Sequence, residues 1–88
     1  MFNLKNRTAI VTGGGGILGR RFSNILSEYG ANVAVFDVDI ENANLTVSEI
    51  KKNNPNFNLI AFSCDVSKPE SVQEAVEKVN KIFGSIDI

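Results

Sequence analysis

The stretch Thr8-Ala9-Ile10-Val11-Thr12-Gly13-Gly14-Gly15-Gly16-Ile17-Leu18-Gly19 decides how this chain is interpreted. Its first five residues are rich in β-branched side chains and lack strict alternation, which predicts a strand covered on both faces. Glycines follow at once, and they allow the positive φ of a tight turn and the close approach of backbone to a phosphate. The stretch therefore predicts a strand, a turn able to hold a phosphate, and the start of a helix.

Three of these glycines, Gly14, Gly16 and Gly19, satisfy the spacing G-x-G-x-x-G. The spacing alone is weak evidence, but here it follows a predicted strand and opens a predicted helix, as in dinucleotide-binding proteins. The N-terminus of such a helix directs free N–H groups and the positive end of its dipole at an anion. A flexible glycine linker is the alternative, but a linker would lack the flanking apolar runs.

Outward from this stretch, two more apolar runs, residues 32–36 and 58–63, also have the character of buried strands. Between the strands lie segments of helical period. The first has one apolar face and ends at Gly30, and we expect that face to be buried: Leu18, Phe22, Ile25, Leu26 and Tyr29.

The two later helices have distinct start signals. Asp39 is a plausible N-cap of the second helix, which carries apolar residues at positions 43, 47 and 50 and ends before Pro55. Ser67 and Glu70 fit a capping box at the start of the third, which ends at Gly84. Its expected buried stripe is Val72, Ala75, Val76, Val79 and Phe83.

The order β-α-β-α-β-α-β predicts an α/β fold, a three-layer αβα Rossmann-like sandwich with a parallel sheet of strand order 3-2-1-4. Residues 85–88 begin the fourth strand, beside the first, and the chain stops there. We therefore expect residues 1–88 to form one NAD(P)-binding domain that is either part of a longer protein or covered on that side by a partner.

Acidic residues follow the second and third strands, at the sheet edge where open α/β folds bind ligands. Asp37 stands eighteen residues after Gly19, where a carboxylate can bind the ribose hydroxyls of a dinucleotide and would repel a 2′-phosphate. NAD is therefore favoured over NADP. The alternative interpretation of Asp37 is a simple acid at a strand end with no ligand contact. Asp65 could accept a hydrogen bond from adenine while the Val66 N–H meets a ring nitrogen, but a turn acid is equally consistent.

The composition excludes several other classes of function. Nine Lys and Arg against ten Asp and Glu give a net charge of −1, which offers no attraction for nucleic acid or an anionic membrane. One cysteine and no histidine exclude an internal disulfide and the usual zinc sites, so no metal site is expected. No apolar run approaches the length of a membrane helix or a signal-peptide core, and a cytoplasmic location is the default. Arg20 and Arg21 are interpreted as solvated surface charges rather than phosphate ligands.

Taken together, Val11-Thr12-Gly13, the glycine cluster, Asp37, Cys64-Asp65-Val66 and Phe83-Gly84-Ser85-Ile86-Asp87 resemble short-chain dehydrogenases/reductases. The resemblance covers essentially the whole chain. It implies an NAD(P)-dependent oxidoreductase with a small-molecule alcohol or carbonyl substrate, a homo-oligomer when full length. By position, the resemblance implies that the pyrophosphate would be lined by Gly13, Gly16 and Gly19 and approached by Ile17 and Leu18. Asp37 would hold the ribose. The adenine would be held by Asp65 and Val66.

The sequence also departs from the family pattern. The compact branch has Thr-Gly-x-x-x-Gly-x-Gly, which requires glycine at position 17, whereas glycines 13, 16 and 19 match the extended branch of nucleotide-sugar epimerases and dehydratases. The segment 83–87 nevertheless resembles the compact branch. The family's catalytic Ser and Tyr-x-x-x-Lys are absent, and Tyr29, the only tyrosine, is expected in the helix core. No catalytic residue is therefore predicted here, and a non-catalytic nucleotide-binding module is the further alternative.

Overall fold

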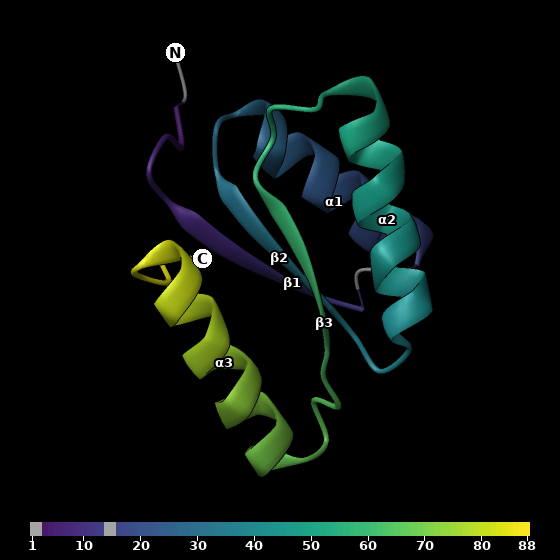
Figure 1. The fold of residues 1–88 in the computed structure, drawn as a ribbon, viewed down its shortest axis with the longest axis vertical. Helices are drawn as coiled ribbons and strands as arrows, with labels where there is room; N and C mark the ends of the chain where they lie inside the picture. Colours follow the sequence, from purple (N-terminus) through teal and green to yellow (C-terminus); the bar gives the residue numbers. More distant parts are fainter. Residues whose placement is uncertain (1–2, 14–15) are drawn as a thin grey trace.

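The computed structural model describes residues 3–13 and 16–88, so the predicted place of Gly14 lies outside the described residues. Strands and helices alternate along the chain, as the sequence predicts (Figure 1). The elements are β1 (Thr8–Thr12), α1 (Ile17–Glu28), β2 (Asn32–Asp37), α2 (Ile40–Asn53), β3 (Leu59–Ser63) and α3 (Pro69–Phe83).

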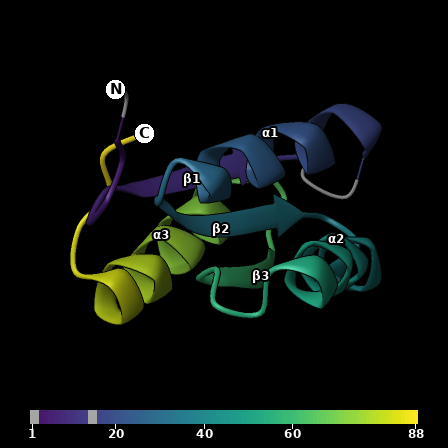
Figure 2. The same ribbon diagram turned by 90° about the horizontal axis from the view of Figure 1, so that it is seen from above.

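The described strands form a parallel sheet in the order β1-β2-β3, with β2 in the centre (Figure 2). Thr8 of β1 pairs with Asn32 of β2, and Val33 of β2 pairs with Leu59 of β3. Because β2 is covered on both faces and both edges, residues 33–36 are all buried. The continuous apolar run of β2 is therefore buried on both faces, as its sequence pattern predicts.

Helices cover both faces of the sheet, which gives the predicted three layers: α3 lies on one side of the strands, and α1 and α2 on the other (Figure 1). Two separate apolar clusters fill the spaces between the layers. Val33 and Val35 point into the cluster that α2 joins through Ala43 and Ile50. The alternate residues Ala34 and Phe36 point into the cluster formed with α3.

The face that α1 presents to the sheet differs from the prediction. Its buried residues are Gly19, Ser23 and Ser27, because small side chains let a helix backbone lie close to a strand layer. The predicted apolar face points largely to solvent, and Tyr29, expected in the core, is 44% exposed. Leu26 alone among those five residues packs against the core.

The start of α2 confirms its predicted cap, whereas the start of α3 does not. The Asp39 carboxylate accepts from the Glu41 N–H at 3.0 Å, as an N-cap residue should. Ser67 is not the N-cap of α3, because the helix begins at Pro69, and the Ser67 hydroxyl donates to the Asp65 carboxylate at 2.6 Å. Lys68 occupies the cap position without a side-chain hydrogen bond.

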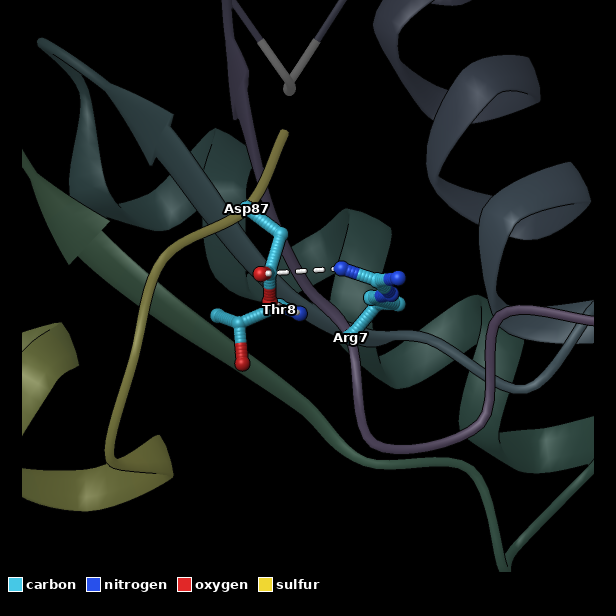
Figure 3. A network of polar contacts seen from close by, with 3 residues as sticks. All are labelled: Arg7, Thr8 and Asp87. Atoms are coloured by element: carbon cyan, nitrogen blue, oxygen red, sulfur yellow. Dashed lines mark hydrogen bonds and ion pairs between the residues drawn. The ribbon is translucent and has the colours of Figure 1, made fainter.

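The C-terminal segment lies beside β1, where the order 3-2-1-4 places a fourth strand. The Asp87 and Ile88 N–H groups both donate to the Thr8 carbonyl, and the Ile10 N–H donates to the Ile88 carbonyl. The Asp87 side chain adds an anchor, because it accepts from the Thr8 N–H at 3.1 Å and from the Arg7 guanidinium at 3.4 Å (Figure 3). This carboxylate fixes the end of the chain to the first residue of β1.

Replacing Asp87 with alanine is expected to destabilise the fold by about 1–3 kcal/mol, because the Thr8 N–H loses its carboxylate acceptor. Urea denaturation followed by circular dichroism measures the loss. Arg7→Ala is the control: it removes only the ion pair, whose Arg side chain is 61% exposed, and should cost less than about 1 kcal/mol. Equal losses in the two variants would contradict the assigned role of the Thr8 hydrogen bond.

Candidate functional site

The candidate site is the edge of the sheet where the three strands end. Thr12, the last residue of β1, pairs with Phe36, and Asp37, the last residue of β2, pairs with Ser63. Gly13, Asp37 and Asp65 therefore stand at the same edge of the sheet. The spatial requirement of the sequence interpretation is met, since the glycine turn and the acid do not lie at opposite ends. In open α/β sheets, ligands bind at this edge.

The turn after β1 needs glycine at its first position. Gly13 has a φ of +62°, in the left-handed region that other residues rarely adopt. A Cβ on Gly13 would meet nothing within 4 Å, so the backbone here borders open space rather than a neighbouring element. The Gly16 N–H donates to the Gly13 carbonyl at 3.1 Å, and this bond closes the turn just before α1.

The N-terminus of α1 faces this open space without a negative partner of its own. Gly16 caps the helix with no side-chain hydrogen bond, and the first turn of α1 carries no acidic residue. The N–H groups of Ile17, Leu18 and Gly19 have no acceptor within the helix, because a helix leaves its first N–H groups unpaired. The arrangement can hold an anion, which would meet both these donors and the positive end of the helix dipole.

These three residues differ in how their side chains are placed. Ile17 is 79% exposed and Leu18 64%, whereas Gly19 is buried on the side of the helix that meets the sheet. The Ser23 hydroxyl donates to the Gly19 carbonyl at 2.8 Å. Gly19 lies within α1 and serves its close packing on the sheet, which is one of the roles that glycine has in such a motif.

Asp37 is held at the end of β2 by its backbone and its side chain. Its carbonyl accepts from the Cys64 N–H at 2.9 Å, and its Oδ1 accepts from the Asp39 N–H at 2.9 Å. Asp39 is the N-cap of α2, as predicted, so the Asp37 side chain does not cap that helix. A carboxylate offers about four acceptor positions, so the bond from the Asp39 N–H is compatible with a ligand hydroxyl. Val38, which sequence reasoning did not single out, follows it and is 70% exposed.

Asp65 is a turn acid in this structure. Its Oδ1 accepts from the Ser67 hydroxyl at 2.6 Å and from the Ser67 N–H at 3.0 Å. These hydrogen bonds, helped by the charge of Lys68, lower the pKa of the Asp65 carboxyl below its ordinary value against a smaller opposing effect of desolvation. Val66 beside it is 63% exposed. The adenine contacts expected of Asp65 and Val66 stay predictions.

Removing the Ser67 hydroxyl should raise the pKa of Asp65 toward its ordinary value, because the hydroxyl bond is the largest cause of the lowering. NMR titration of the Asp65 carboxyl carbon in Ser67→Ala measures this shift, with Ser85→Ala, an exposed serine elsewhere, as control. Because the folded-state pKa is lowered, the interaction stabilises the fold above the unfolded pKa and is lost as the pH falls through the folded one. An unchanged midpoint would show that another group holds the pKa down.

The two arginines of α1, Arg20 and Arg21, lie between α1 and α2. The Arg20 guanidinium donates to the Glu49 carboxylate of α2 at 2.8 Å, so it connects the two helices of one layer. Both arginines line a surface pocket between α1 and α2, together with Ile17, Asn24 and Asn53. Arg21 is exposed, as its interpretation as a surface charge predicts, whereas Arg20 is partly buried and paired with Glu49.

Comparison with known proteins decides the family. The sequence pattern of the short chain dehydrogenases matches residues 7–88. This chain belongs to the short-chain dehydrogenase family. It is 36% identical over 81 residues to carbonyl reductase family member 4 of Danio rerio, covering 92% of this chain and 32% of that protein. It is 31% identical to an NAD-dependent glycerol dehydrogenase of Listeria innocua, covering 99% and 32%.

Solved structures of short-chain dehydrogenase relatives support the same fold. A structure described as a D-mannonate oxidoreductase from Haemophilus influenza, with bound NAD, matches with a TM-score of 0.88 and 30% identity, covering 97% of this chain and 30% of that one. The chain thus spans about a third of the length of these three relatives. Among the residues that the structure describes, no helix is both long enough and apolar enough to cross a membrane.

Proposed function

We propose that this short-chain dehydrogenase chain binds NAD and forms the cofactor-binding part of an oxidoreductase that acts on an alcohol or carbonyl group of a small molecule. One observation carries the proposal: the N-terminus of α1, with no acidic residue in its first turn, lies at the same sheet edge as the Asp37 carboxylate. The first can hold a diphosphate and the second a pair of ribose hydroxyls, and a dinucleotide carries both groups next to each other.

Each part of the nucleotide has a proposed contact. The pyrophosphate lies against Gly13, Gly16 and Gly19, with donors from the N–H groups of Ile17 and Leu18. The adenosine ribose binds the Asp37 carboxylate. The adenine lies beyond it, between the ends of β2 and β3, where Asp65 and Val66 follow β3.

The preference for NAD over NADP rests on charge. A 2′-phosphate would replace the hydroxyl that Asp37 binds and place a second negative group within a few ångströms of its carboxylate, which costs on the order of 1–4 kcal/mol near a protein surface. The relatives support the assignment, since one is named as NAD-dependent and another was solved with NAD.

A bound nicotinamide supplies hydride transfer, and the residues of this chain bind and orient the nucleotide. The chain contains no Tyr-x-x-x-Lys pair to exchange a proton with a substrate oxygen. We therefore expect binding without turnover from these 88 residues. One alternative function is a nucleotide-sugar epimerase or dehydratase, and it rests on the spacing of Gly13, Gly16 and Gly19. The other is a non-catalytic nucleotide-binding module, and it rests on the missing Tyr-x-x-x-Lys pair. The cytoplasmic location and the homo-oligomer of the full-length enzyme stay predictions.

Calorimetric titration of the chain with NAD, NADP and ADP-ribose tests the proposal. We expect NAD to bind more tightly than NADP, by about tenfold or more. ADP-ribose should bind nearly as tightly as NAD, because every proposed contact is with the ADP-ribose half. Tighter binding of NADP would overturn the role of Asp37, and heat changes with none of the three would overturn the site as a whole.

A further inference from the structure

Asp39, the residue that caps α2, follows Asp37 by two positions and is exposed at the same edge of the sheet. Its main-chain N–H donates to the Asp37 Oδ1 at 2.9 Å, and its own Oδ1 accepts from the Glu41 N–H at 3.0 Å. Each bond joins a carboxylate to the N–H two residues further on, so two turns of the same kind follow one another. These turns fix Asp39 beside the carboxylate to which the ribose is assigned.

The hydrogen bonds also limit how far apart the two acidic groups can be. The Asp39 N–H contacts an oxygen of Asp37, and an aspartate carboxylate lies within about 5 Å of its own main-chain nitrogen. The two carboxylates are therefore within about 8 Å of each other. A phosphate placed on the ribose at Asp37 would lie at a similar distance from Asp39. At this distance, charges interact measurably when the salt concentration is low, because the Debye length is then about 30 Å.

The negative charge of Asp39 is not offset by an ion pair within residues 3–13 and 16–88. The ion pairs in this part of the chain join Arg7 to Asp87 and Arg20 to Glu49. Glu41, in the first turn of α2, adds a further acidic group at this end of the helix. The neighbourhood of Asp37 therefore repels a second anion more strongly than Asp37 would alone.

We propose that Asp39 is a second residue that determines the preference for NAD over NADP, through its charge, while Asp37 makes the direct contact. The inference rests on the proposed binding of the ribose by Asp37. A 2′-phosphate carries about −1.5 to −2 charge at pH 7, as other phosphate monoesters do, and meets repulsion from both carboxylates, whereas a 2′-hydroxyl carries no charge. The bond from the Glu41 N–H holds the Asp39 carboxylate at the start of α2, so Asp39 acts over a distance.

Two neutral N-cap residues separate the charge of Asp39 from its structural role. Asparagine and serine both cap helices well, so Asp39→Asn and Asp39→Ser should preserve the start of α2, and both keep the main-chain N–H that Asp37 accepts. Glu28→Gln is the matched control. It removes the same charge at the last residue of α1, about 17 Å along the helix from the N-terminus that faces the site. Circular dichroism confirms that each variant is folded.

NMR titration of the backbone amides with NAD and with NADP measures the dissociation constants, including weak ones in the millimolar range. We expect the ratio of the NADP constant to the NAD constant to fall by about two- to fivefold in both Asp39 variants at roughly 10 mM salt, because one repulsive charge is removed. The difference should shrink at roughly 500 mM salt, where the Debye length is only a few ångströms. Glu28→Gln should leave the ratio unchanged.

The outcomes distinguish this inference from the proposed function. If both Asp39 variants bind NAD and keep the original ratio at low salt, the role of Asp39 is overturned and the proposed function stands. A fall in the ratio that is equally large at high salt, or that occurs in only one of the two variants, also overturns it, because the effect would then come from shape rather than charge. If the unaltered chain binds neither cofactor, the proposed function fails and this inference fails with it.

Discussion

Replacing Asp37 with asparagine is expected to lower the affinity of the chain for NAD by about tenfold or more. A hydrogen bond to a charged acceptor contributes about 1.5–3 kcal/mol, and the substitution removes that charge from the proposed ribose contact. The amide oxygen of asparagine can still accept from the Asp39 N–H, so the turn at the end of β2 is retained. Calorimetric titration of the folded variant with NAD measures the change.

Two comparisons make this result specific to the ribose contact. Glu74→Gln causes the same change in charge on the exposed side of α3, across the sheet from α1, and should leave NAD affinity unchanged. In Asp37→Asn, the affinity for NADP should stay constant or rise, because the repulsion of the 2′-phosphate is gone. Equal losses for NAD and NADP would mean that Asp37 supports the fold of the loop and makes no ribose contact.

Sequence reasoning predicts which residues meet at the sheet edge, because parallel strands constrain where they end. Once residues 8–12 and 32–37 are identified as neighbouring parallel strands, their ends must lie at one edge, and the glycine turn and Asp37 come together without further information. The same logic extends to Asp65 after β3. The positive φ of Gly13 follows from the tight turn that a strand needs before a returning helix.

The prediction of buried faces is less secure, because periodicity shows that a helix has an apolar side without showing what covers it. In α1, the sheet takes the side with Gly19, Ser23 and Ser27, where the backbone can approach most closely, and the larger residues remain outside. In α2, by contrast, Ala43 and Ile50 lie on the periodic face and are buried as predicted. The difference lies in packing distance, which the pattern of apolar residues does not encode.

Local hydrogen bonds are a second limit on prediction. Ser67 and Glu70 have the spacing of a capping box, but the Asp65 carboxylate stands two residues before Ser67 and accepts both its N–H and its hydroxyl. These two bonds hold Ser67 in the turn that follows Asp65, and α3 begins only at Pro69, after Lys68. Asp65 was visible in the sequence, but the turn that it forms with Ser67 depends on the backbone geometry.

Replacing Phe36 with alanine is expected to cost about 3–5 kcal/mol, which is a large part of the stability that a domain of this size has. Phe36 is 2% exposed in the central strand, and its ring meets that of Phe62 edge to face, with centroids 5.8 Å apart. The loss combines the transfer of the ring, the cavity left between β2 and α3, and the lost aromatic contact. Urea denaturation followed by circular dichroism measures it.

Phe22→Ala is the matched control, because it makes the same chemical change at a side chain that is 51% exposed on α1. This variant should lose less than about 1 kcal/mol, since its ring already contacts water. The contrast between Phe36 and Phe22 tests the assignment of the layers, because only Phe36 belongs to the buried apolar cluster between β2 and α3. Similar losses at both positions would mean that the Phe22 ring of α1 is packed against the rest of the domain as firmly as Phe36 is.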